Sequence, residues 1–514
     1  MDRRQTLLVM VALMTATFIT ALDIMVVGTV MPTIIGQLGG LPLYTWVFTA
    51  YLLTSTVTVP IYGKLADLFG RLPVFFTGVV IFLIGSALCG LAQSMEQLVV
   101  FRAIQGLGAG AVQPLVITMV GDLFSIEQRA RFSALFGAVW GFSSVIGPFI
   151  GGTLTEAVSW RFVFYVNIPV GVIACLLLAR YYPERTVHRA RSIDFPGAVL
   201  LTLGLTGMLL ALAPGHAGAG IELGAFLMLA VPSAALLVAF VKVESRAKEP
   251  ILPLELFKIP AITVGAVVVL LSSAAQFGLT SFIPLWEQGV QGGSPTMAGL
   301  LLVPLSVCWS AGSFAGGKVI LRYGFRPCLL AGVGCILAGC APLPAINPTW
   351  PLWLVGGLSA VVGLGLGFTS LATTVATQNS VGWERRGVAT STNLFARTVG
   401  GAIGITLLGT LLTTRLAERI TQAGISLPGT ADGSVLNLAN AILEPSLRSA
   451  LPADALLVLQ AALSDALGPV FTGAALFGAA ACIAALKFPA MTASGLAAEQ
   501  TQRSDASVGP GVHR

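Results

Sequence analysis

The sequence predicts an all-α polytopic membrane protein, because its composition is apolar and its charged residues are confined to short clusters. Of 514 residues, 55% are hydrophobic and 10% are charged, whereas roughly a quarter of the residues in a soluble domain are charged. Fourteen apolar runs separate the clusters, and each is close to the ~20 residues that cross a bilayer as a helix. The runs are 7–31, 43–63, 74–93, 97–121, 132–155, 161–180, 195–213, 222–241, 261–285, 297–317, 327–346, 352–377, 389–413 and 465–487.

Basic residues indicate the side of the membrane on which the runs are connected. Most lysines and arginines lie near the termini or after even-numbered runs, as do Lys64 and Arg71 after the second and Lys318 after the tenth. Short cytoplasmic connections carry such an excess. We therefore expect a multi-pass protein of the inner (cytoplasmic) membrane with both termini in the cytoplasm. Topology and contact with anionic lipid explain the net charge of +6, and nucleic acid is not an expected partner.

Two connections repeat the same pattern. Gly63–Pro73 follows the second run, Gly317–Pro327 follows the tenth, and Gly, Lys, Gly and Pro recur at identical offsets. Repeats of this kind describe two six-helix bundles with substrate bound near the membrane midplane between them. The predicted units are an N-terminal bundle with a cytoplasmic linker over 1–194, an inserted transmembrane hairpin over 195–241, a C-terminal bundle over 242–491 that contains a long extracytoplasmic loop over 414–464, and a disordered cytoplasmic tail over 492–514.

Two opposite charges lie inside apolar runs of the first bundle. A charge such as Asp23 at bilayer depth costs a few kcal/mol and usually faces a cavity or a partner. Thr20 lies one turn from it, while Arg102 shares a helix face with Gln105 and Gln113. We predict that Asp23 binds a proton or a cationic substrate and that Arg102, which stays charged, tunes it. The alternatives are a carboxylate satisfied by neighbouring helices and an arginine that serves packing and pairing.

Conformational switching is predicted in the connection after the second run and in the fifth run. Asp67 can accept hydrogen bonds from a helix N-terminus across the bundle interface and so hold one conformation. In the fifth run, glycines allow helices to approach closely and slide, and a proline adds a bend. A solvated turn and plain tight packing are the alternatives. The residues predicted for the switch are Gly63, Asp67, Gly70, Arg71, Gly147, Pro148, Gly151 and Gly152.

The second bundle contributes four further candidates. Glu287 lies at the outer end of the ninth run, where it is either a vestibule carboxylate or a solvated rim residue. Arg397 lies one to two turns inside the thirteenth run, where it either takes part in gating or extends to the cytoplasm. Gln378 and Asn379 follow the twelfth run directly.

Enzymatic chemistry has no visible basis in the sequence. A phosphate-binding loop of the form Gly-x4-Gly-Lys-Ser/Thr is missing, so ATP is not expected to power the protein directly. The seven cysteines lie in or at the ends of the apolar runs without metal-ligand spacing. We therefore expect a protein that is not an enzyme and that needs neither a cofactor nor a metal.

Five motifs occur in the order found in a known family. They are Leu22–Pro32 in the first run, Gly63–Arg71 after the second, Arg102–Gly110 in the fourth, Gly137–Gly152 in the fifth and Trp160–Gly171 at the start of the sixth. On these residues the chain resembles the fourteen-span drug:proton antiporters of the major facilitator superfamily. The resemblance covers essentially the whole chain. Leu68 and Leu72 depart from it, because the family usually has basic residues at these two positions of its loop signature.

The resemblance implies the major facilitator fold, with two six-helix bundles and two additional linker helices. It also implies a proton-coupled multidrug efflux transporter, of the kind that gives antibiotic resistance, that exports small amphipathic or lipophilic compounds as a functional monomer. In the implied mechanism proton and substrate compete for one site. The alternatives are a same-fold exporter or uniporter of a specific metabolite (an amino acid, a sugar or a siderophore-like compound) and a membrane receptor or platform that does not transport.

Overall fold

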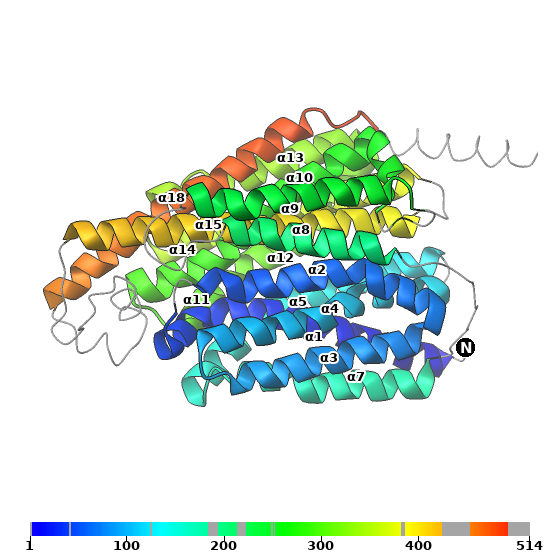
Figure 1. Ribbon diagram of the computed structural model, residues 1–514, viewed down its shortest axis with the longest axis horizontal. Helices are drawn as coiled ribbons and strands as arrows, with labels where there is room; N and C mark the ends of the chain where they lie inside the picture. The colour runs from blue at the N-terminus through cyan, green and yellow to red at the C-terminus, as the bar shows by residue number, and fades with distance from the viewer. Residues whose placement is uncertain are drawn as a thin grey trace, which may run out of the picture.

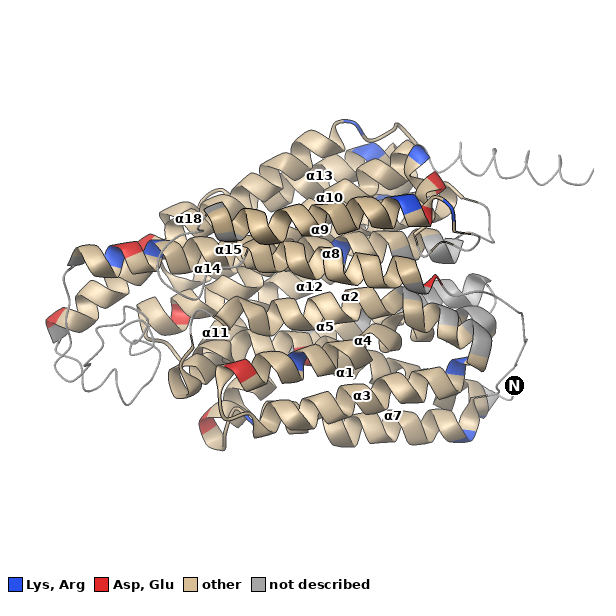
Figure 2. Ribbon diagram, in the orientation of Figure 1, with Lys and Arg blue, Asp and Glu red and all other residues tan. Residues whose placement is uncertain are grey.

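The computed structural model describes residues 3–40, 43–123, 126–182, 194–212, 223–247, 250, 252–381, 386–423 and 453–491. Within these ranges every regular element is helical, and the long helices run side by side along the long axis of the molecule (Figure 1). Most charged residues gather toward the helix ends, while the middle of the molecule is almost free of them (Figure 2). A bilayer imposes this distribution.

The helices coincide with the predicted apolar runs, since each run overlaps a long helix. The first half contains α1 (Arg3–Leu38), α2 (Tyr44–Phe69), α3 (Arg71–Leu91), α4 (Met95–Leu123), α5 (Ile126–Ala157), α6 (Phe162–Tyr165) and α7 (Asn167–Tyr181). A hairpin follows, made of α8 (Phe195–Leu212) and α9 (Leu223–Glu244). The second half contains η2 (Leu254–Lys258), α10 (Pro260–Leu285), η3 (Trp286–Gln291), α11 (Pro295–Leu300), α12 (Val303–Tyr323), α13 (Phe325–Cys340), η4 (Leu343–Ala345), α14 (Leu352–Asn379), α15 (Arg386–Ala423) and α18 (Ala453–Ala485).

Among the described residues, 11 helical segments are long and apolar enough to cross a membrane. The other three predicted runs correspond to α2, α5 and α8, which are not among these segments, although α8 contains a shorter apolar helix over Pro196–Leu212. The chain is therefore a multi-pass membrane protein that is helical in the part the structure describes, and the total of fourteen spans stays a prediction.

The two halves form separate bundles that lie beside each other (Figure 1). In the first half α4 packs against α2 and α3, and in the second half α14 packs against α12 and α13. The halves meet along two seams, one between α5 and α11–α12 and one between α2 and α15. The hairpin lies beside the second seam, where α8 contacts both α2 and α15. We call the end of the molecule that holds the N-terminus the terminal end, and the opposite end the far end (Figure 1).

The repeated connection has the same backbone conformation in both halves. Gly70 separates α2 from α3 with a φ of 94°, and Gly324 separates α12 from α13 with a φ of 91°. This region is open to glycine and costly for other residues, which explains why glycine recurs at this offset. Because the connection is a single residue, Gly63 and Asp67 do not lie in a turn, as the sequence pattern indicated, but in the last turns of α2, which ends at Phe69.

Two helices extend into the predicted loop over 414–464. α15 continues to Ala423 and α18 already begins at Ala453. Apolar residues at helical spacing on the two helices are buried in one cluster and explain the extension. They are Leu412, Leu416 and Ile420 on α15, and Leu459, Leu463 and Leu467 on α18. The remainder of the predicted loop and the predicted tail lie outside the described residues.

Candidate functional site

Asp23 and Arg102 form an ion pair inside the first half. The Arg102 guanidinium donates to Asp23 Oδ2 at 2.6 Å, and both side chains are only 1% exposed. α1 supplies the carboxylate and α4 the guanidinium, so the pair joins two helices that are distant in the sequence. A buried pair of this kind is costly to desolvate and needs further hydrogen bonds to be satisfied.

Two polar side chains supply hydrogen bonds to the pair, and a third is bonded to one of these two. Gln105 donates to Asp23 Oδ1 at 2.8 Å and accepts from Arg102 at 2.7 Å. Asn167, at the start of α7, donates to the same Asp23 oxygen at 3.1 Å and to Ser86 Oγ at 3.0 Å. Ser86 of α3 in turn donates to the Phe164 carbonyl. The network therefore ties α1, α3, α4 and α7 together, and Asp23 accepts from three donors.

α2 covers the cationic side of the network. The Arg102 guanidinium lies 4.1 Å from the centroid of the Tyr51 ring, and its Nε donates to the Val47 carbonyl at 3.4 Å. A guanidinium over an aromatic face gains cation–π energy. α2 thus covers Arg102, the ion pair is buried, and its two charges balance each other.

Asn167 and Ser86 were not among the predicted site residues, whereas two predicted residues lie outside the network. An amide inside the apolar run 161–180 was the available signal for Asn167. The Thr20 hydroxyl donates to the Thr17 carbonyl of its own helix at 3.0 Å. Gln113 is half-buried eight residues beyond Gln105 on α4, about 12 Å along the axis.

Part of the predicted switch lies on described residues. Gly63 is half-buried and has open space where a side chain would begin, while Gly70 forms the turn and Arg71 begins α3. The side chains of Asp67 and Pro148 lie outside the described residues. The glycines of α5 make close contacts: a methyl group at Gly147 would come within 2.8 Å of Met25 Cβ on α1.

The other two α5 glycines extend this close packing. Gly151 faces Val26 of α1, and Gly152 faces Thr296 of α11 in the second half. A side chain at Gly152 would overlap with the backbone of Thr296. At these points α5 therefore contacts α1 and α11 with no side chain of its own between the helices.

Polar contacts also join the two halves at the far end of the molecule. Thr33 donates to Gln288 Oε1 at 3.1 Å, and Gln288 donates to the Thr29 carbonyl at 3.0 Å. Thr296 donates to Glu156 at 2.9 Å. Tyr44 donates to the Ser281 carbonyl, and the hydroxyls of Thr49 and Thr406 lie 3.1 Å apart. The halves are held together at this end by pairs that the sequence did not reveal.

Glu287 is buried rather than exposed at the rim. It belongs to η3, a single π-helical turn that continues α10, and the residue is 2% exposed. Its Oε2 and the indole nitrogen of Trp286 are both buried without a hydrogen-bond partner. Buried polar atoms without partners are rare, and each calls for a functional or conformational explanation.

Arg397 is the other candidate of the second half with a defined environment. Its guanidinium donates to Ser370 Oγ of α14 at 2.6 Å and lies 5.2 Å from the centroid of the Trp309 ring on α12. Gln378 donates to Thr390 at 3.1 Å, and Asn379 ends α14. These residues are not in contact with the Asp23 network.

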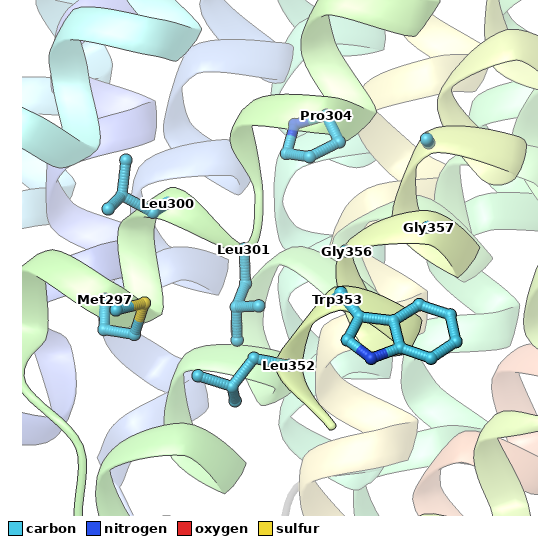
Figure 3. A pocket seen from close by; sticks show the side chains of 9 residues that line it. Met297, Leu300, Leu301, Pro304, Leu352, Trp353, Gly356 and Gly357 are labelled. Atoms are coloured by element: carbon cyan, nitrogen blue, oxygen red, sulfur yellow. The ribbon is translucent and has the colours of Figure 1, made fainter. Parts of the chain in front are cut away.

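A shallow apolar pocket lies on the second half, between α11, α12 and α14 (Figure 3). Its walls include Met297, Leu301 and Pro304, and Trp353 at its edge is 76% exposed. Its lining residues in the described part of the chain are all uncharged. An exposed apolar surface of this kind suits contact with lipid chains.

Three comparisons with known proteins agree with this architecture. The sequence profile of the Major Facilitator Superfamily matches residues 13–405. The multidrug transporter protein MdtP of Bacillus subtilis (strain 168) is 38% identical over 476 residues, which cover 91% of this chain and 87% of MdtP. Multidrug resistance protein 3 of the same organism is 36% identical over 457 residues, covering 87% of this chain and 88% of that protein.

A solved structure has the same fold. The chain superposes on a bacterial homologue of the human lysosomal transporter Spinster, in an inward-facing and unoccupied conformation, with a TM-score of 0.66. The sequences are 16% identical, and the match covers 95% of this chain and 98% of the other. At this identity the likeness concerns the fold alone.

Proposed function

Because the chain belongs to the Major Facilitator Superfamily, whose members are membrane transporters and not enzymes, we propose that it exports small amphipathic or lipophilic compounds in exchange for protons. The names of the relatives, which are multidrug transporters, support the export of more than one compound. The proposal includes the finer class of fourteen-span drug:proton antiporters, in the inner membrane, with both termini in the cytoplasm and with the monomer as the working unit.

The buried Asp23–Arg102 pair is the observation that carries proton coupling. A neutral network of one acid and one base changes its net charge by one unit when Asp23 takes up a proton. The excess positive charge on Arg102 then favours rearrangement of α1 against α4, because an unbalanced charge at this depth is costly. A proton bound to Asp23 thereby favours one conformation, and a bound cargo favours the other.

The two conformations differ in the end of the molecule at which the halves are held together. The contacts of Gln288, Tyr44 and Glu156 hold the halves together at the far end, which we assign to the extracytoplasmic side. This form would receive cargo from the cytoplasm. The glycines of α5 would let the halves rock against each other. At the terminal end, Asp67 and Arg71 would hold the opposite form. A charge that crosses 100 mV is worth about 2.3 kcal/mol, which drives accumulation.

Everted membrane vesicles test the proposal. A pH gradient, acidic inside, is imposed and followed with a fluorescent pH probe while candidate compounds are added. Export in exchange for protons predicts that transported compounds dissipate the gradient in vesicles with the protein and not in vesicles without it. A protein that moves these compounds at a rate independent of the gradient would be a uniporter, and one that moves none would be no multidrug exporter.

A further inference from the structure

Arg397 is a cation inside the membrane-spanning region, and no acidic side chain among the described residues pairs with it. A guanidinium carries five N–H donors, and in the described structure Arg397 uses one hydroxyl, that of Ser370, as its acceptor. The guanidinium also lies over the ring of Trp309. All three residues are half-buried, so part of each side chain is left uncovered by the protein.

The three residues lie on the side of the second half that faces the first half. α12 and α15 are the helices through which the second half contacts α5 and α2, and α14 packs against both of them. A side chain that starts on α15, bonds to α14 and covers a ring on α12 therefore lies across the surface between the two seams. This is the region where transporters built from two bundles bind substrate.

The other interior charges are already used or sealed. Asp23 and Arg102 neutralise each other, and each side chain is 1% exposed. Glu287 is also buried and belongs to η3, beyond the last residue of α10. Among the described residues between the two seams, the charge that a cargo meets is thus the positive charge of Arg397. It stays protonated at any physiological pH.

The geometry points to Arg397 and Trp309 as a binding site for the anionic group and the adjoining ring of the cargo, which makes lipophilic organic anions a substrate class of this transporter. A carboxylate or sulfonate can accept two parallel hydrogen bonds from the guanidinium. An aromatic portion of the same molecule can then stack beside Trp309. The inference rests on the proposed export function, because it names the cargo of that function.

Three naphthalene derivatives of equal size test the inference: 1-naphthoate, 1-naphthylmethylammonium and 1-naphthylmethanol. Equilibrium dialysis of the purified full-length protein measures binding of each, and everted vesicles measure export of the two ions. We expect tighter binding and faster export of the anion than of the cation. In Arg397→Gln, binding of 1-naphthoate should weaken about ten- to hundredfold, as for the loss of a hydrogen-bonded charge, while binding of the alcohol changes little.

Two further variants separate the site from the scaffold. Arg397→Lys keeps the charge but loses the two-pronged geometry, so it should bind 1-naphthoate with intermediate affinity. The matched control is Arg415→Gln, since Arg415 forms an exposed pair with Glu418 on the same helix, and it should bind like the wild type. Should Arg397→Gln not fold, the preference of the wild type and the intermediate affinity of Arg397→Lys decide the matter.

The outcomes distinguish this inference from the function beneath it. Proton-driven export of the cation with no preference for the anion would overturn the inference and leave the exporter intact. Unchanged binding of 1-naphthoate in Arg397→Gln would do the same. Failure of the wild type to export any tested compound of either charge would overturn both.

Discussion

Gln288 of the second half is bonded twice to α1 of the first half. Its amide donates to the Thr29 carbonyl at 3.0 Å, and its oxygen accepts from the Thr33 hydroxyl at 3.1 Å. One side chain makes both bonds, so both are lost together when the halves separate at the far end. Gln288 lies in the π-helical turn η3, next to Glu287. A hydrogen-bonding group and a buried acid are therefore neighbours where η3 meets α1.

Replacing Gln288 by Leu should open the far end more often. Two hydrogen bonds worth ~1 kcal/mol each correspond to a shift of about tenfold or more in a two-state population. The measurement is labelling of a cysteine at Thr45 by a membrane-impermeant maleimide, in a background without the native cysteines. The matched control is Gln291→Leu, because the bonds of Gln291 among the described residues go to carbonyls of its own half, those of Pro348 and Trp350. Equal labelling of the two variants would show that Gln288 does not hold the far end closed.

Replacing Glu287 by Gln should have the opposite effect. The Oε2 atom of this carboxylate is buried without a hydrogen-bond partner. This favours a conformation in which water reaches it, because an uncompensated buried charge costs several kcal/mol. The neutral amide has a similar shape and removes this cost. We expect slower labelling at Thr45 and a thermal midpoint raised by a few degrees, and no change for Glu418→Gln on the exposed part of α15. Faster labelling of Glu287→Gln would show that the acid closes the seam.

Replacing Asp23 by Asn should abolish proton-driven export. It should also lower stability by about 3–5 kcal/mol, since Arg102 then stays buried without a counter-charge. The double variant Asp23→Asn, Arg102→Gln should regain much of that stability but not the export. Thermal unfolding in detergent and everted-vesicle export measure the two effects separately. Normal pH-dependent export by Asp23→Asn would move proton coupling to another acid, with Glu287 next.

Replacing Asn167 by Leu should loosen the network without changing its charge. The amide supplies one donor to Asp23 and one to Ser86, and losing it leaves buried acceptors unsatisfied at a cost of about 1–3 kcal/mol. Thermal unfolding measures the loss. Gln113→Leu on α4 is the comparison, because Gln113 is half-buried outside the network and should change stability by less than about 0.5 kcal/mol. Equal losses would mean that Asn167 contributes by packing alone.

The predicted topology can be tested without any assay of transport. Fourteen spans with cytoplasmic termini require that a cysteine at Gly433 reacts with an impermeant reagent from outside intact cells. A cysteine at Ser504 should react only after the membrane is permeabilised. If both sites react from the same side in intact cells, the number of spans between them is wrong.

The apolar runs predicted where the helices lie, because length and hydropathy are properties of single segments. They failed at helix ends: α15 and α18 extend well past their runs. Polar residues such as Arg415 and Glu418 hid the apolar stripe of Leu412, Leu416 and Ile420, which is visible only at a spacing of four.

The sequence likewise predicted only part of the Asp23 network. The sequence places two opposite charges at bilayer depth, and this predicts a functional pair. It did not show that Asn167 completes the network, because the pairing depends on how α7 packs against α1 and α3. The seam residue Gln288 was missed altogether, since an amide near the end of an apolar run looks like any residue at the membrane surface.

The extension of α15 and α18 beyond the apolar runs turns a pair of membrane helices into a projecting arm. Arg419 and Asp465 lie 3.7 Å apart on it, and the ten residues of 414–423 add about 15 Å of helix. Because the arm is continuous with helices of the second half, any tilt of that half is magnified at its tip. An antibody fragment raised against this arm would therefore serve as a pointer whose orientation, seen by electron microscopy, reports which way the transporter faces.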